Sequence, residues 1–318
     1  MVVNAAVDAA VFFLLLGAAV LGVTAADAGA RADSAVVEDD RPDAVAAVLA
    51  TSTATVNYSL APGARRANVR ADADEHGSVR FERTAGPEFR RTTRGSLGGL
   101  LARAAVGTAG FDGAPVTHAR DDLRRAVDGA VQERISTVGL RVDALWRPYP
   151  GAPVEGRVAV GGAPPDGAAV DAATLTVPTG AKPLSPDETR DFASLSGAVA
   201  DRTVEVLVPA TRMRLALRDD APVSTFARYR YARLAAELDA PVTDDVDDAD
   251  TGTANRRLAS ALAPRVESDL RARYDSPEAA AAAVSASEVR IVVRAWDADG
   301  GGRGGAREPA DSRAEGGR

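Results

Sequence analysis

The longest apolar run in the chain lies near the N-terminus. Residues 9–26 (AAVFFLLLGAAVLGVTAA) form 18 consecutive positions without a charged side chain. As an α-helix this run would be about 27 Å long at ~1.5 Å per residue, close to the ~30 Å hydrocarbon thickness of a bilayer. We therefore predict a membrane helix over about 6–26 and treat residues 1–26 as a transmembrane anchor, with a buried core helix as the alternative.

The same run shares some features with a cleaved secretory signal. Ala26-Asp27-Ala28 and Ala28-Gly29-Ala30 both match the A-x-A pattern of a cleavage site. However, no Lys or Arg precedes the run, and the run is longer than the ~7–15 apolar residues of a typical signal. A retained anchor is therefore the preferred interpretation, and a cleaved signal is the alternative.

Small and charged residues over 27–42 predict a linker that leaves the membrane. Basic residues do not fix the orientation, because none precedes the apolar run and only Arg31 and Arg41 follow it closely. The downstream region has Ser/Thr-rich strands without an excess of basic residues. We therefore expect the main domain to lie outside the cell.

Beyond the linker, helical and strand patterns follow one another without the regular alternation of βαβ units. Apolar residues spaced three or four apart predict helices, and alternating apolar and polar residues predict strands. The predicted helices cover 42–49, 96–107, 120–138, 185–208, 226–238, 254–274 and a short Ala-rich segment after Ser276. The predicted strands cover 56–60, a hairpin over 67–83, 139–146, 156–161, 172–178 and 289–296.

Four local features of the sequence add to this prediction of helices and strands. Ser185 and Glu188 have the spacing of a capping box at a helix start. Pro264 is expected to kink or split its helix. Residues 204–217 alternate well enough to form a strand pair instead of a helix, and the Asp-rich run 244–250 predicts a solvated loop.

The predicted fold class is α+β, in which the membrane helix precedes a domain of mixed antiparallel strands and helices. This extracytoplasmic domain covers 43–297, either as one body or as two subdomains that meet near 178–186. The last residues, 298–318, have no large apolar side chains, so they predict a disordered tail.

The amino-acid composition excludes several kinds of site and partner but does not identify a function. Ala contributes 68 of the 318 residues, as many as Val, Leu, Ile and Phe together, and the formal net charge is −7. The absence of Cys excludes disulfides and cysteine-based zinc sites. The acidic balance argues against a nucleic-acid partner. A core of Ala-faced helices on Val-rich strands favours a scaffold or interaction domain over one with a deep apolar pocket.

Asp8 is the only ionisable side chain before Asp27. A carboxylate early in an apolar helix is costly and therefore a candidate for function. The arrangement resembles type IV pilins and pseudopilins, in which such a residue pairs with the terminus of the neighbouring subunit during assembly. The chain departs from that family at Val3, where the family has Gly or Ala after a basic stretch. The resemblance makes Asp8 the assembly candidate and implies other pilus or secretion subunits as partners.

The whole chain also resembles archaeal proteins, namely the single-span, Ala/Arg/Asp-rich exported proteins of haloarchaea, whose function is largely unassigned. Its basic residues are almost all Arg, with Lys182 as the single Lys.

Few residues have a pattern typical of catalysis or metal binding. Asp72, Glu75 and His76 form the most metal-like cluster, but they are nearly contiguous on a predicted turn, where neighbouring side chains diverge. Only two His occur in the chain, and neither a G-x-S-x-G motif nor a phosphate loop is present. We therefore predict no enzyme, no cofactor and no metal site, and keep a metal-assisted hydrolase at these three residues as the least favoured alternative.

Other candidates concern the surface of the domain. Asn57 lies in the only N-x-[ST] sequon and is a glycosylation candidate outside the cell. Trp146 and Tyr149 belong to the only concentration of aromatic and Pro residues after the anchor, which makes them partner-binding candidates. Arginines also interleave with the aromatic residues of 226–233, a pattern that we interpret as an ordinary amphipathic helix.

Together these features predict a single-pass protein of the cell membrane with its main domain outside the cell. The preferred function is a structural or assembly role, as in a pilus-like or secretion apparatus. The alternative is an anchored surface binding module for a solute or a partner protein.

Overall fold

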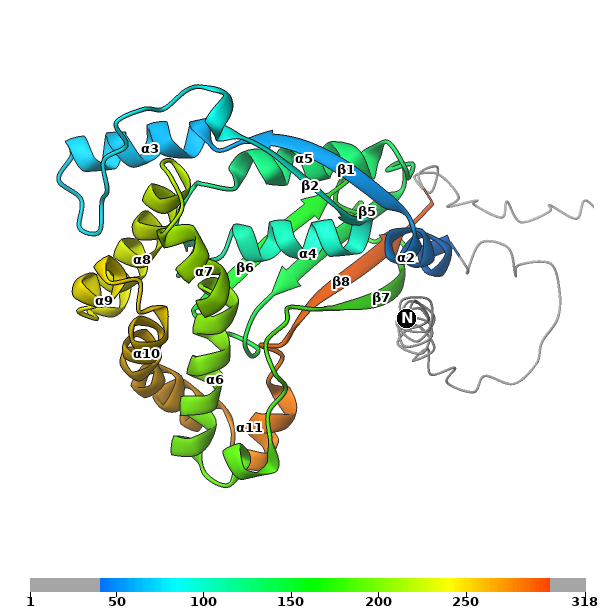
Figure 1. Cartoon of the computed structure of the whole chain (residues 1–318). Helices are drawn as coiled ribbons and strands as arrows, with labels where there is room; N and C mark the ends of the chain where they lie inside the picture. Colours follow the sequence, from blue (N-terminus) through cyan, green and yellow to red (C-terminus); the bar gives the residue numbers. More distant parts are fainter. Residues whose placement is uncertain (1–40, 298–318) are drawn as a thin grey trace, which may run out of the picture. The chain divides into compact units, whose positions relative to one another are not determined.

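A six-stranded antiparallel sheet organises residues 41–297, the part of the chain that the computed structural model describes (Figure 1). The order of the strands is β4-β3-β6-β5-β8-β7. Their bounds are β3 (Gly110–Phe111), β4 (Ala114–Pro115), β5 (Leu140–Trp146), β6 (Val154–Val160), β7 (Asp171–Pro178) and β8 (Glu288–Ala295).

The helix α4 (Leu97–Gly107) covers one face of this sheet, and Figure 1 shows it crossing the strands. Apolar residues at alternate strand positions are buried on that face, for example Val142 on β5 and Ile291 on β8. The backbone of α4 approaches β6 closely at Gly156, where a Cβ atom would lie 2.1 Å from the Ala105 carbonyl oxygen. Small residues on both elements therefore set the spacing between helix and sheet.

A helical region is inserted between β7 and β8, which are neighbours in the sheet. It comprises the 3₁₀-helix η2 (Pro186–Thr189), α6 (Phe192–Leu207), α7 (Ala210–Leu217), α8 (Val223–Leu238), α9 (Thr243–Asp247), α10 (Thr251–Arg273) and α11 (Pro277–Ala283). The long helices α6 and α10 pack against each other. The core therefore continues from the sheet into a helical layer.

The remaining elements come from the first part of the described chain. They are α2 (Arg41–Thr51), β1 (Thr53–Ser59), α3 (Ala61–Asp72), η1 (Pro87–Phe89), β2 (Arg90–Ser96) and α5 (Asp121–Gln132). The strands β1 and β2 form a separate antiparallel pair. Buried Phe81, Phe89 and Tyr229 form a second, smaller apolar cluster beside α3.

The mixed α+β class with antiparallel sheets is confirmed, whereas the hairpin predicted over 67–83 is wrong. Most of its first half belongs to α3, where Ala61, Ala64 and Ala67 are buried at helical spacing. Val69, within the predicted hairpin, lies on α3 and is 67% exposed. The prediction is wrong because alternation over a few residues was read as a strand, whereas the buried face of α3 consists of Ala at helical spacing.

Several helix boundaries also differ from their predictions. The predicted capping box of Ser185 and Glu188 is present, but it caps η2, while α6 begins later with Asp191 as its N-cap. The helix predicted to reach residue 138 ends at Gln132, and Val138 is 67% exposed.

Helices form where the sequence left alternatives or predicted a break. Residues 204–217 lie mainly in α6 and α7, not in strands. The Asp-rich run contains the short helix α9, because Val246 is buried there. α10 is one helix with Pro264 inside it, since buried residues such as Leu258 and Leu270 hold both halves against the core.

Among residues 41–297, no helix combines the length and apolar character that a membrane crossing requires. The predicted anchor over 1–26, the linker up to residue 40 and the tail 298–318 lie outside the described residues. Asp8 therefore lies outside them as well.

Candidate functional site

A cavity of about 330 Å³ lies where α4, α7 and α8 approach the ends of α6, β7 and β8. Four arginines line it: Arg103 on α4, Arg120 immediately before α5, Arg212 on α7 and Arg230 on α8. Among residues 41–297, none of those that line the cavity is acidic. The cavity is therefore strongly cationic.

One face of α4 makes room for the cavity. Gly99, Ala102, Arg103, Val106 and Gly107 all line it and recur at intervals of one helical turn. At Gly107 a Cβ atom would lie 2.8 Å from Cδ of Arg120, so the glycine allows the aliphatic part of that arginine to pack on the helix. The Ser96 side chain accepts a hydrogen bond from the Gly99 amide at 3.1 Å and fixes the start of α4.

Arg230 is held in place by a hydrogen bond from its Nε to the Leu207 carbonyl oxygen, at 2.7 Å. Burial lowers the pKa of Arg230 to about 10, and the charge of Arg120 contributes to the shift. Burial also lowers the pKa of Arg120; the charges of Arg103 and Arg212 act in the same direction, while Tyr58 opposes them. The folded protein thus holds like charges close together in a partly desolvated place.

The four arginines of the cavity differ from most others in their partners. Within residues 41–297, none of them forms an ion pair with Asp or Glu, although many other arginines of the described chain do. Arg103 donates instead to the Thr93 hydroxyl. The cavity has the hydrogen-bond donors of an anion site without a carboxylate to satisfy them.

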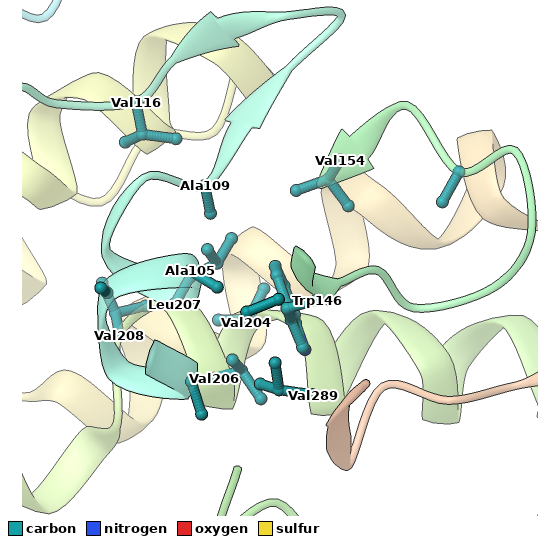
Figure 2. Close-up of a cluster of buried hydrophobic side chains, with 14 of the residues drawn as sticks. Ala105, Ala109, Val116, Trp146, Val154, Val204, Val206, Leu207, Val208 and Val289 are labelled. Carbon is teal, nitrogen blue, oxygen red and sulfur yellow. The ribbon is translucent and has the colours of Figure 1, made fainter. Parts of the chain in front are cut away.

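Aliphatic side chains form the rest of the cavity wall. Figure 2 shows Val206, Leu207 and Val289 in the buried cluster around Trp146, and the same three residues line the cavity. The cavity therefore borders a well-packed core, which keeps its apolar side in place.

A second arginine cluster serves as a contrast. Asp143 on β5 is buried and accepts hydrogen bonds from Arg141, Arg157 and Arg294 at 2.7–3.1 Å. Burial alone would raise the pKa of Asp143, but the hydrogen bonds and charges of Arg141 and Arg157 lower it below its ordinary value. The anion of this cluster is Asp143 itself, so the cluster is a structural network of ion pairs.

Trp146 and Tyr149, predicted to contact a partner, are core residues with at most 1% of their surface exposed. The Trp146 indole donates to the Ala286 carbonyl oxygen at 3.0 Å. Burial raises the pKa of Tyr149, and a hydrogen bond with Asp269 adds to the shift. A filled core around these two side chains opposes a role in contacting a partner.

Asn57 is exposed on β1, where its side-chain oxygen accepts a hydrogen bond from the Thr92 hydroxyl at 2.7 Å. The sequon is therefore accessible at the surface of the folded unit.

The residues of the metal-like cluster, Asp72, Glu75 and His76, contact arginines in the structure. Asp72 pairs with Arg80 at 2.6 Å, and Glu75 lies 3.6 Å from Arg70. The His76 carbonyl oxygen accepts a hydrogen bond from Arg233 at 2.8 Å. Within the described part of the chain, no group of three or more His, Cys, Asp or Glu side chains is placed to hold a metal ion.

Sequence reasoning missed the cavity because its arginines are far apart in the chain and share no motif. The aromatic and basic pattern of 226–233 was noticed, and Tyr229 and Tyr231 are indeed buried on one side of α8. Only the tertiary fold brings Arg230 beside Arg103, Arg120 and Arg212.

By fold and site, the chain is an α+β protein with an arginine-lined cavity. Residues 7–296 match the family described as a family of unknown function (DUF7284), so the chain belongs to that family. The match includes the whole apolar run 9–26 as well as nearly all of the folded unit. No curated protein and no solved structure matches the chain.

Proposed function

We propose that this protein is a single-pass membrane protein whose folded unit, outside the cell, binds an anionic ligand in the arginine-lined cavity. The observation that carries the proposal is the set of four arginines around one cavity that has no acidic lining residue among residues 41–297. The proposed role is binding, without catalysis or a cofactor.

The physical argument rests on charge. Bringing several cations together costs free energy, and a partly desolvated site increases that cost. An anion would offset the repulsion and accept the unused guanidinium hydrogen bonds, which match carboxylate and phosphate oxygens in pairs. A purely structural cluster would contain its own carboxylate, as the Asp143 cluster does.

A thermal-unfolding assay on the full-length chain in non-ionic detergent tests this function. Phosphate or sulfate is compared with chloride at equal ionic strength. A bound anion stabilises the folded state by about 2.7 kcal/mol when its concentration is ~100 times Kd. We therefore expect both multivalent anions to raise Tm.

The variants locate the effect. The double variant R120Q/R230Q should lose the rise in Tm. The exposed Arg134→Gln, whose residue has no acidic partner among residues 41–297, serves as the matched control and should keep it. An equal rise in Tm for wild type and the double variant would contradict the proposal.

A second proposal is an assembly role through the N-terminal segment, as in a pilus-like or secretion apparatus. It is favoured by Asp8, the only ionisable side chain before Asp27. Cross-linking in native membranes tests it. Asp8→Asn should abolish oligomer bands that the control Asp27→Asn retains, and unchanged bands in both variants would exclude this role for Asp8.

A further inference from the structure

The number of positive charges around the cavity restricts the kind of anion. Four arginines line the cavity, of which Arg120 and Arg230 are half-buried and the other two are exposed, and a monocarboxylate would compensate only one of these charges. A phosphate monoester carries about −1.5 to −2 charges near neutral pH and offers three strong acceptor oxygens. A phosphate-type dianion therefore fits the charge of the site better than a single carboxylate does.

The size of the cavity indicates that the phosphate bears an organic group. The volume of about 330 Å³ lies at the lower end of the ~300–1,000 Å³ that small-molecule sites occupy. The cavity therefore has room for more than a bare phosphate. The ligand should therefore extend beyond its charged head.

The side chains around the remaining space show what that extension should be. They are aliphatic or thioether groups, namely Ala102, Val106, Val177, Val206, Leu207, Met213 and Val289. Within the described part of the chain, no aromatic side chain lines the cavity, so a nucleobase would find no stacking partner there. Thr179 supplies the only hydroxyl among the lining side chains of residues 41–297, so most hydroxyl groups of a sugar would lack partners.

Building on the anion-binding function proposed above, we infer that the ligand is a phosphate monoester with a short aliphatic group. Its phosphate lies among Arg103, Arg120, Arg212 and Arg230, and its aliphatic part lies against the Val206, Met213 and Val289 side. The same chemistry occurs in a soluble alkyl phosphate and in the headgroup region of phosphatidic acid.

Titration calorimetry on the full-length chain in phosphatidylcholine nanodiscs tests the inference with four soluble probes: butyl phosphate, inorganic phosphate, butyrate and glucose 6-phosphate. Burying the butyl group should make butyl phosphate bind at least about tenfold more tightly than each of the other three. R120Q/R230Q should lower its affinity by about tenfold or more, whereas Arg134→Gln should leave it unchanged.

The half-buried Met213 on α7 provides the test of the apolar side. Met213→Ser should reduce the advantage of butyl phosphate over inorganic phosphate by about tenfold and leave the affinity for inorganic phosphate unchanged. The unchanged affinity would show that the variant is still folded.

A separate arm distinguishes the two sources of the ligand. Nanodiscs with phosphatidic acid are compared with nanodiscs that contain phosphatidylserine. Loss of butyl phosphate binding only with phosphatidic acid assigns the site to the lipid, and retained binding in both assigns it to a soluble phosphate.

Two results would contradict the inference in different ways. Equal affinities for butyl phosphate and inorganic phosphate, or tighter binding of glucose 6-phosphate, would overturn the inference and leave the anion-binding function in place. No binding of any phosphate probe would overturn both.

Discussion

The charged side chain of Arg230 lowers the stability of the folded state. It is half-buried on α8, donates to the Leu207 carbonyl oxygen and lies near a second cation, Arg120. Burial, with the charge of Arg120, lowers the pKa of Arg230 from 12.5 to about 10. An empty cavity therefore carries an unfavourable charge at neutral pH.

The depressed pKa of Arg230 predicts a pH dependence of stability. Between pH 10 and 12.5 the unfolded chain binds a proton at this residue that the folded chain has lost. Stability contributed by Arg230 therefore rises as the pH increases through about 10. We expect the free energy of unfolding of wild type, relative to Arg230→Gln, to increase between about pH 8 and pH 11.

Urea denaturation at the two pH values measures this difference, and the titration of tyrosines cancels because both proteins contain the same ones. Arg134→Gln, at an exposed position, should show no such pH dependence relative to wild type. A wild-type advantage that stays constant or shrinks with rising pH would contradict the assignment.

The sequence could not reveal this site at the residue level. Helical spacing placed Arg103 and Arg230 on helices, but an arginine on an amphipathic helix normally points to solvent. What turns these arginines toward one space is the packing of α4, α7 and α8 around the ends of two strands. By contrast, a local rule was enough for Ser276, which caps α11 as its sequence predicts.

Elements with a strong periodicity of Val and Leu were predictable, whereas α3, whose buried face is made of Ala, was not. The strands β5, β6, β7 and β8 and the helices α4, α8 and α10 lie close to their predicted ranges, because Val and Leu mark their buried faces. α3 was missed because Ala61, Ala64 and Ala67 form its buried face. In an Ala-rich chain, the usual signal of bulky apolar residues disappears although the close packing remains.

The close contact between α4 and β6 leads to a prediction about the packing of these two elements. A side chain at Gly156 would meet the Ala105 carbonyl oxygen at 2.1 Å, which is a clash with backbone that cannot rotate away. We expect Gly156→Ala to force α4 off the sheet and to lower the free energy of unfolding by about 1–3 kcal/mol or more.

Gly129 supplies the matched control for this substitution. It lies in α5, and a Cβ atom there would meet no other atom within 4 Å. Gly129→Ala should therefore raise stability by about 0.5–1 kcal/mol through helix propensity. Urea denaturation compares both variants, and similar stabilities would show that α4 does not depend on the absence of a side chain at Gly156.

At the scale of the whole chain, the family match covers both the apolar run and the folded unit. Residues 7–296 match one family, and this range includes the apolar residues 9–26 as well as nearly all of the described residues. The proposed membrane location rests on the N-terminal sequence alone, and the proposed ligand rests on the folded unit.

Leu15 lies within the apolar run, where a charge should be most costly if the segment spans a bilayer. An arginine at the centre of a membrane helix costs about 2.5–3.5 kcal/mol on insertion scales. We therefore expect Leu15→Arg to shift the full-length protein from the membrane to the soluble fraction in fractionation without detergent. Val36→Arg, within the predicted linker, should remain in the membrane fraction. Recovery of intact wild-type protein from the cytosol would contradict the anchor. Orientation is tested separately, with protease added to intact cells. Protection of the folded unit from this protease would contradict its placement outside the cell.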